Sequence, residues 1–312
     1  MNALDKARFE LDWSQDRSFQ VVGMGSNAVD WICVLAEYPR HNTKSQILER
    51  LRLGGGQIAT AITLCGRYGL QASYIGRVGD DENGCFSLED LGKEPIDISH
   101  MDVVPGAFSQ YAFILVDRPT GERTVLWQRD PQLLYKPGEL KREWIVQGRL
   151  LHMDGHDQAA CIQAAQWARE AGMKVCLDID KFQPGVEDLL PLTDFVVPTI
   201  GFTQRFSGKK DWREALLVVS EATPGYVIVT RGKEGAAIMW KGRIIEIPGI
   251  TVNAVDTTGA GDVFHGAFIY SLFQDWSVES CLQFSNVAAA LSCTRYGARG
   301  GIPTIEEVLA LT

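Results

Sequence analysis

Asp256-Thr-Thr-Gly-Ala-Gly-Asp262-Val-Phe264 joins a glycine-rich turn to an apolar helical pattern that runs to Phe273. Glycines allow close approach to the backbone, and the free N–H groups of a first helical turn carry partial positive charge. The stretch therefore predicts an anion site at this helix start. Asp262 lies in that turn, where a carboxylate can accept a proton from a hydroxyl nucleophile. The alternative is that Asp256 and Asp262 only cap the helix.

Outside this stretch, short apolar runs alternate with helical patterns, which is typical of βα units around a mainly parallel sheet. We expect one α/β domain over residues 1–312, with the sheet flanked by helices in three layers. The expected strands are 19–24, 72–78, 150–154, 175–179, 195–197 and 226–230. The expected helices include 57–68, 158–170, 259–273, 278–296 and 304–311, and β pattern is found at 237–240 and 243–248.

Residues 31–53 and 108–129 break this rhythm because they show β-like alternation without a helix. Asp117-Arg-Pro-Thr-Gly121 indicates a turn between 111–116 and 123–128, so a hairpin is expected there. The two segments can form a small sheet that acts as a lid, or an ordinary meander on the edge of the main sheet. A lid with exposed edges would also offer a homodimer surface, since an unpaired strand invites a partner.

The charge, the apolar runs and the cysteines of the sequence disfavour several classes of protein. A net charge of −9 disfavours a nucleic-acid surface, which needs clustered Lys and Arg. No apolar run approaches the roughly 18 residues of a membrane span, and the charged start at 1–10 is unlike a signal peptide. The seven cysteines are scattered and odd in number, which is typical of reduced thiols. We therefore expect a cytoplasmic protein that acts on a small polar molecule.

Further motifs accompany the 256–264 run in a fixed order. Gly54-Gly-Gly-Gln-Ile-Ala-Thr60 precedes Gly76-Arg-Val-Gly-Asp-Asp-Glu-Asn-Gly84, and Gly25-Ser-Asn-Ala-Val-Asp30 stands near the start. Over nearly the whole chain these motifs resemble the ribokinase-like (PfkB) carbohydrate kinases. Phe264-His265-Gly266 is similar to the sequence in kinases of ketohexoses and sulfonated fructose derivatives. The resemblance implies a ribokinase-like fold with a small β-sheet lid, and ATP-dependent phosphorylation of a sugar hydroxyl.

The resemblance also implies roles for residues by position. Asp262 would be the catalytic base, and the anion hole for the γ-phosphate would be the backbone of Gly259, Ala260 and Gly261. The implied sugar contacts are Asp30, Gly55 and Gly56, and the implied nucleotide contacts are Thr230, Gly232 and Asn286. In potassium-activated members the D-T-T run helps to hold the ion, which implies K⁺ ligands at Asp256 and Thr258.

The chain departs from the family pattern in two places. The N-x-x-E element that organises Mg²⁺ in the family is replaced by Pro198 and Gly201. Mg²⁺ can be held chiefly by substrate phosphates, so this loss need not abolish catalysis. Thr60 stands where ribokinases carry a sugar-contacting asparagine, and Gln57 stands at a lysine-like position, which makes ribose less certain. His265 indicates a keto-sugar or furanose acceptor, or it is a solvated helix histidine.

Other motifs point elsewhere or remain open. His152-Met-Asp-Gly-His-Asp157 has residue types found in Zn sites, but at the end of a strand it more simply faces the sugar, with Asp154 as a hydroxyl contact. Gly23-Met-Gly25-Ser-Asn-Ala28 imitates a dinucleotide fingerprint without the supporting acid, and no P-loop sequence occurs. The alternatives to a sugar kinase are a nucleoside kinase of the same fold and a non-catalytic sugar or nucleotide sensor.

Overall fold

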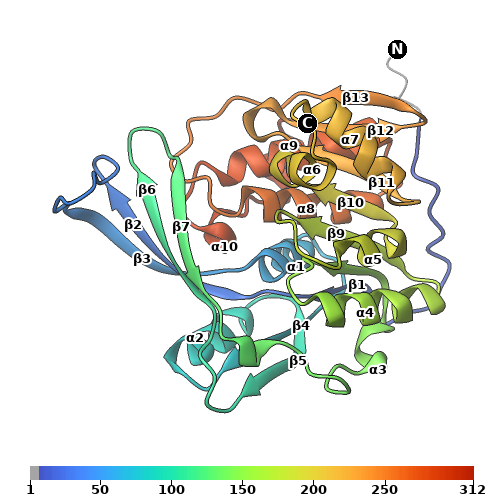
Figure 1. Cartoon of the computed structure of the whole chain (residues 1–312), viewed down its shortest axis with the longest axis horizontal. Helices are drawn as coiled ribbons and strands as arrows, with labels where there is room; N and C mark the ends of the chain where they lie inside the picture. The colour runs from blue at the N-terminus through green and yellow to red at the C-terminus, as the bar shows by residue number, and fades with distance from the viewer. Residues whose placement is uncertain (1–6) are drawn as a thin grey trace.

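A nine-stranded sheet runs through the middle of the molecule (Figure 1). In this computed structural model, which describes residues 7–312, its strands are β1 (Phe19–Met24), β4 (Ala72–Gly79), β5 (Asp97–Val104), β8 (Gly148–Met153), β9 (Lys174–Ile179), β10 (Phe195–Pro198), β11 (Tyr226–Thr230), β12 (Ala236–Trp240) and β13 (Arg243–Ile247). Their order is β13-β12-β11-β10-β9-β8-β1-β4-β5, and only β12 and β13 run antiparallel to their neighbours. The six expected parallel strands are all present, and β5 is an additional edge strand.

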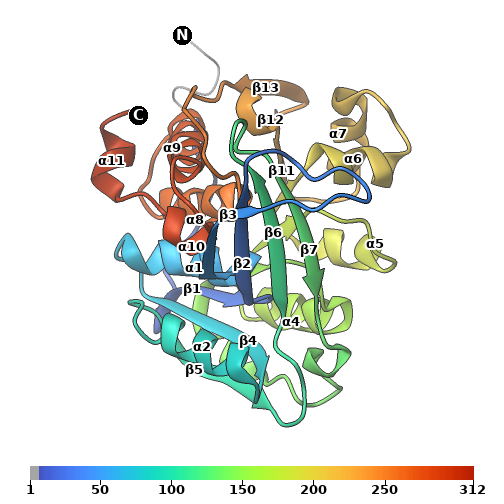
Figure 2. The same ribbon diagram turned by 90° about the vertical axis from the view of Figure 1, so that its left-hand side faces the viewer.

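Helices cover both faces of this sheet, which gives three layers (Figure 2). One face carries α1 (Gln57–Arg67), α8 (Ala260–Leu272) and α9 (Val278–Ser292), and the other carries α4 (Gln158–Glu170), α5 (Val186–Leu189), α6 (Ile200–Ser207) and α7 (Trp212–Glu221). Alternate strand residues point to opposite faces, so Ile228 packs in one core cluster while Val227 and Val229 pack in the other. The remaining α-helices are α2 (Glu82–Leu91), α3 (Arg142–Ile145), α10 (Ala298–Gly301) and α11 (Ile305–Leu309).

The two segments without helices form a second, four-stranded sheet that stands off the main sheet (Figure 1). Its strands are β2 (Ala28–Leu35), β3 (Ile47–Gly55), β6 (Tyr111–Asp117) and β7 (Arg123–Gln128), in the order β3-β2-β6-β7. The expected hairpin is present as the antiparallel β6–β7 pair. Ile32, Val34 and Ile114 form a small core on one face of this sheet. A separate lid sheet is therefore the correct reading, and a meander on the main-sheet edge is wrong.

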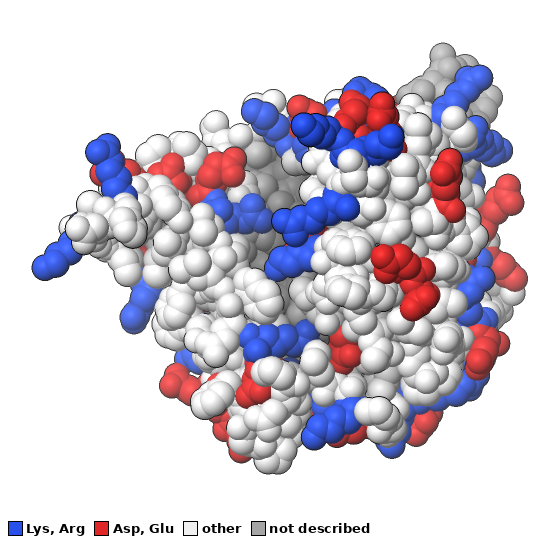
Figure 3. Space-filling model, viewed as in Figure 1, with Lys and Arg blue, Asp and Glu red and all other residues white. Residues whose placement is uncertain are grey.

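Parallel strands place their carboxyl ends along one side of a sheet, and ligands bind beside those ends in open α/β sheets. Here the loops after β8 and β9, the start of α8 and the root of the lid strands β2 and β3 meet at that side. Figure 3 shows a hollow between the lid and the helices of the main domain, with Lys and Arg side chains along its margins. Among residues 7–312, no helix has the length and apolar character that a bilayer crossing requires.

Candidate active site

The glycine-rich turn leads directly into the first turn of α8. Gly259 has a left-handed backbone (φ 77°), and a Cβ there would lie 2.4 Å from the Cβ of Ala298, so glycine is required. A Cβ at Gly261 would meet nothing within 4 Å, which shows that the turn is open on this side. Within residues 7–312 the amides of Gly261 and Asp262 donate no hydrogen bond. These free N–H groups can therefore bind an anion.

The buried carboxylate of Asp256 fixes this turn. Its Oδ1 accepts hydrogen bonds from the amide (2.9 Å) and the hydroxyl (2.6 Å) of Thr258, and its Oδ2 accepts one from the amide of Gly297 (2.8 Å). These bonds compensate for the hydration that a fully buried carboxylate loses. They also join the start of α8 to the loop before α10. A monovalent cation at Asp256 and Thr258 would have to share these oxygens with the protein donors.

Two carboxylates from other elements act electrostatically on Asp262 of α8: Asp178 from β9 and Asp30 from the lid strand β2. Burial, followed by the charges of Asp178 and Asp30, raises the pKa of Asp262 well above its ordinary value. Burial raises the pKa of Asp30 to about 7, although the positive charge of Arg299 opposes this rise. Burial, followed by the charge of Asp180, raises the pKa of Asp178. The cluster therefore provides a carboxylate that is an unusually strong proton acceptor when ionised.

Arg299 supplies buried positive charge behind Asp30. Its side chain is almost completely buried, and its Nη1 donates to the Oδ1 of Asn27 (3.0 Å) and to the carbonyl of Gly55 (3.0 Å). Its Nε donates to the Oδ2 of Asp90 in α2 (3.1 Å). A buried arginine is tolerated only when it is paired and hydrogen-bonded, and these contacts meet that need. Arg299 thus links α10, α2 and the root of the lid.

Three consecutive glycines bring the lid strand β3 against these charges. A Cβ at Gly54 would lie 1.8 Å from the Nη2 of Arg299, and one at Gly55 would lie 1.9 Å from the Oδ2 of Asp30. Gly56 precedes α1 with φ 93°, in the left-handed region that favours glycine. The expected sugar contacts Gly55 and Gly56 therefore lie beside Asp30. Thr60 lies one turn further along α1, where it is fully buried.

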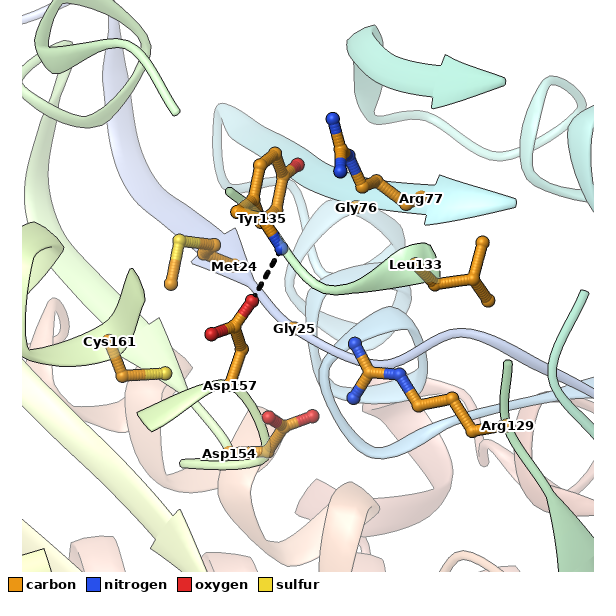
Figure 4. Close-up of a pocket in the computed structure, with 10 residues that line it drawn as sticks. All are labelled: Met24, Gly25, Gly76, Arg77, Arg129, Leu133, Tyr135, Asp154, Asp157 and Cys161. Carbon is orange, nitrogen blue, oxygen red and sulfur yellow. Dashed lines mark hydrogen bonds between the residues drawn. The ribbon is translucent and has the colours of Figure 1, made fainter. Parts of the chain in front are cut away.

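Asp154 follows β8 and lines a pocket between β1 and the lid (Figure 4). Its Oδ2 accepts a hydrogen bond from the amide of Ser26 (2.7 Å), and its Oδ1 accepts one from the amide of His156 (3.1 Å). Figure 4 shows the guanidinium of Arg129, which follows β7, pointing into the same pocket. Arg129 forms no hydrogen bond or ion pair with residues 7–312. The pocket therefore offers both an acceptor and a charged donor to a polar ligand.

A hydrogen-bonded chain connects the carboxylate cluster with this pocket. The Nε2 of Gln57 donates to the Oδ2 of Asp178 (3.1 Å), and the Nε2 of His156 lies 2.6 Å from the Oε1 of Gln57, where it donates. The ring of Trp127 lies 6.4 Å from that of His156, and the Nζ of Lys181 lies 4.6 Å from the Trp127 ring. The wall facing the lid is thus polar, and it lies opposite one aromatic side chain of the lid, Trp127 of β7.

The expected nucleotide contacts lie on the other side of α8. Thr230 ends β11, and its hydroxyl donates to the carbonyl of Pro198 (3.5 Å). Gly232 is exposed, with φ 58°. The amide of Asn286 in α9 donates to two backbone carbonyls at the end of β13 (3.1 and 3.2 Å), so it holds that strand in place. Pro198 and Gly201, at the place of the family's magnesium element, offer no ligating side chain.

His265 is buried, so its reading as a solvated helix histidine is wrong. Helix α8 is enclosed by the sheet and by α1 and α9, and every residue from Val263 to Leu272 is buried. The Nε2 of His265 lies 3.2 Å from the Oδ1 of Asp178. His265 therefore reaches the carboxylate cluster through Asp178.

Sequence reasoning missed Asp178 and Arg299. For Asp178 a signal existed, because Asp178-Ile-Asp180 places two carboxylates at the end of an expected parallel strand. Arg299 had no local signal, since its side-chain partners Asn27, Gly55 and Asp90 are all more than 200 residues away in the sequence.

Comparison with known proteins identifies the family and the fold. The model of the pfkB family carbohydrate kinases matches residues 20–305. A ribokinase of Haemophilus influenzae is 29% identical over 265 residues, which cover 82% of this chain and 86% of that protein. A nucleoside kinase of Methanothermobacter thermautotrophicus is 26% identical over 304 residues (95% and 96% covered). An Arabidopsis thaliana ribokinase structure, complexed with ribose and ATP, shares the fold with a TM-score of 0.80 at 23% identity (94% and 98% covered). The expected fold and family resemblance are confirmed.

Removing Arg299 tests its structural role. Arg299→Ala leaves Asp90 and Asp30 without their buried counter-charge, so we expect the free energy of unfolding to fall by about 3–5 kcal/mol. Urea denaturation followed by circular dichroism measures this change. The matched control is Arg295→Ala, since Arg295 pairs with Glu307 on the surface, and it should cost under about 1 kcal/mol. Equal effects of the two substitutions would contradict the role given to Arg299.

Proposed function

The chain belongs to the pfkB family of carbohydrate kinases, and we propose that it transfers the γ-phosphate of ATP to a hydroxyl group of a furanose or keto-sugar. The family match and the ribokinase relatives make it an ATP-dependent phosphotransferase for a sugar or a nucleoside. The observation that carries the finer proposal is Asp262. Its carboxylate has a raised pKa and lies in a helix turn whose amides are free.

Asp262 is the proposed general base. It takes the proton of the acceptor hydroxyl while that oxygen forms a bond to the γ-phosphorus and the bond from phosphorus to the bridging oxygen of ADP breaks. Burial and the neighbouring carboxylates make ionised Asp262 a stronger base than a free aspartate. The proposed anion hole is the backbone of Gly259, Ala260 and Gly261. The amide of Ala260 donates to the carbonyl of Thr257 (3.4 Å), so the free amides of Gly261 and Asp262 stabilise the charge on the transferring phosphoryl oxygens.

Mg²⁺ neutralises charge between the β- and γ-phosphates in phosphoryl transfer. Pro198 and Gly201 occupy the place of the family's magnesium element. They cannot bind Mg²⁺ through their side chains, because neither side chain has an oxygen atom. Mg²⁺ keeps several waters and binds through phosphates with few protein ligands. We therefore assign the ion no ligand from this element and infer that it arrives with ATP.

Asp30 and Asp154 are the proposed hydroxyl acceptors of the sugar, because a carboxylate accepts hydrogen bonds from two hydroxyls. The backbone of Gly55 and Gly56 completes this side. The lid already touches the glycine-rich turn, since Arg123 donates to the hydroxyl of Thr257 (3.1 Å) and the carbonyl of Gly121 accepts from the amide of Thr257 (3.2 Å). A lid in this position would exclude water from the reaction.

One observation favours the nucleoside alternative. Trp127 on β7 is half exposed and lies near His156, so a base could stack on it. The acidic and basic groups of the pocket, Asp154 and Arg129, instead favour a ligand with many hydroxyl or charged groups. The sugar proposal follows from this polar lining.

Release of ADP over a panel of furanoses, ketoses, acidic sugars and nucleosides tests the acceptor class and the base together. We expect turnover with a sugar and a loss of kcat of about 10²–10⁴-fold in Asp262→Asn, because the proton loses its acceptor. Preferential turnover of nucleosides would overturn the sugar assignment, and no turnover with any acceptor would favour the sensor.

Asp275→Asn is the matched control for Asp262→Asn. Asp275 lies in the exposed turn after α8 with φ 53°, a conformation that asparagine also adopts. We expect it to keep the wild-type kcat. A full-rate Asp262→Asn enzyme would remove the base from the mechanism.

The raised pKa of Asp262 predicts the acid side of the pH profile. The base must be ionised, so kcat should fall as the pH falls through that raised pKa, above the ordinary carboxylate value of about 3.9. Asp180→Asn removes a charge that raises the pKa of Asp262, and the acid limb should move to lower pH. Asp188→Asn in α5 should leave the limb in place, because Asp188 is exposed and is not among the charges that act on Asp262. An acid limb that stays or rises in Asp180→Asn would refute the electrostatic coupling.

We also propose that two copies associate through the lid sheet. Phe113 and Leu126 are register partners on one face of β6 and β7 and expose 45% and 55% of their surface, and β7 is an edge strand. Sedimentation should show a dimer for the wild type and a monomer for Leu126→Asp. Leu309→Asp, at a similarly exposed leucine in α11, should remain dimeric. A monomeric wild type would rule out this interface.

A further inference from the structure

Three side chains with metal-ligand chemistry meet in the core beneath the candidate active site: His152 of β8, Cys176 of β9 and His265 of α8. His152 and Cys176 are direct register partners on neighbouring parallel strands, so their side chains lie on the same face of the sheet. Helix α8 packs on that face. One ligand atom from each residue lies within 4.8 Å of those of the other two, and all three residues are buried.

In each histidine one ring nitrogen lies near an oxygen atom, and the other has no partner within residues 7–312. The Nε2 of His265 lies 3.2 Å from the carboxylate of Asp178, and the Nδ1 of His152 lies 3.2 Å from the carbonyl of Cys176. A carbonyl oxygen accepts, so the Nδ1 of His152 carries the proton, and an ionised Asp178 favours the His265 tautomer with its proton on Nε2. The opposite nitrogens, Nε2 of His152 and Nδ1 of His265, are buried and have no hydrogen-bond partner in the part of the chain that the structure describes. Each therefore presents an unused lone pair in the dry core.

This arrangement is that of metal-bound histidines. A ligating histidine typically donates its second N–H to a carboxylate or a backbone carbonyl, which fixes the ring and its tautomer. His152 makes the contact to a backbone carbonyl, and the Nε2 of His265 faces the carboxylate of Asp178. The rings lie 5.3 Å apart between centroids. Cys176 completes the set, since its thiol is fully buried and forms no hydrogen bond within residues 7–312.

We propose that His152 Nε2, Cys176 Sγ and His265 Nδ1 form a structural site for a divalent transition metal of the zinc type. Two imidazoles and a thiolate are the ligands that Zn²⁺ prefers over Mg²⁺ or Ca²⁺. On binding, the Cys176 thiol loses its proton to solvent and the two imidazoles stay neutral. The site is distinct from the anion site, and it approaches the carboxylate cluster where the Nε2 of His265 lies 3.2 Å from the Oδ1 of Asp178.

Refolding the full-length chain with Zn²⁺ or Co²⁺ tests the site, because the buried ligands are accessible only before the core closes. We expect one equivalent of metal to remain after gel filtration. The Co²⁺ form should show a thiolate-to-cobalt charge-transfer band and the visible bands of a tetrahedral ion. Cys176→Ala should lose the charge-transfer band and the metal.

The matched control is Cys281→Ala, because Cys281 is equally buried but its Sγ donates to the carbonyl of Ser271 and has no histidine neighbour in the cluster. It should keep the bound metal. If circular dichroism shows that Cys176→Ala does not fold, the charge-transfer and visible bands of the wild-type Co²⁺ form decide whether the metal site exists. Refolded wild type without bound metal, or a charge-transfer band that persists in Cys176→Ala, would overturn the proposal.

Discussion

The buried carboxylate of Asp256 sets the position of the groups that the proposed chemistry uses. Its bonds to Thr258 and Gly297 hold the glycine-rich turn against the loop before α10. The left-handed Gly259 then starts α8, so the free amides and Asp262 lie in one rigid turn. An anion and a proton acceptor are thereby kept at a fixed separation before any ligand arrives. Such pre-organisation lowers the entropic cost of bringing the reacting groups together.

The same site contains several buried carboxylates, whose negative charges need a positive charge nearby. Burial raises the pKa of Asp30, Asp178 and Asp262, the charges of Asp178 and Asp30 add to the rise for Asp262, and Arg299 opposes the rise for Asp30. Since Arg299 also donates to the carbonyl of Gly55, the buried cation connects charge balance with the root of the lid. The pKa of Asp30 and the position of the lid root therefore depend on the same contacts of Arg299. We infer that closing the lid changes the environment of Asp30 and Asp262 together.

The sequence predicts those features that depend on local pattern. Strands 19–24 and 226–230 and helix 158–170 have the expected bounds because apolar periodicity is local. The edge strand Asp97–Val104 was missed because its residues are mostly half-buried and include several polar ones. Asp262 was placed correctly in the first turn of α8, whereas Arg299 depends on partners distant in the sequence. The interpretation of His265 as a solvated histidine was wrong, because α8 is buried on all sides and such burial depends on tertiary packing.

The account rests on the distance between Asp262 and the acceptor hydroxyl. A crystal structure of the protein with a non-hydrolysable ATP analogue and its preferred sugar measures that distance directly. We expect a carboxylate oxygen of Asp262 within about 2.6–3.2 Å of the hydroxyl oxygen, with the terminal phosphate on the amides that start α8. A hydroxyl beyond hydrogen-bond reach of Asp262, or a terminal phosphate bound away from this turn, would contradict it.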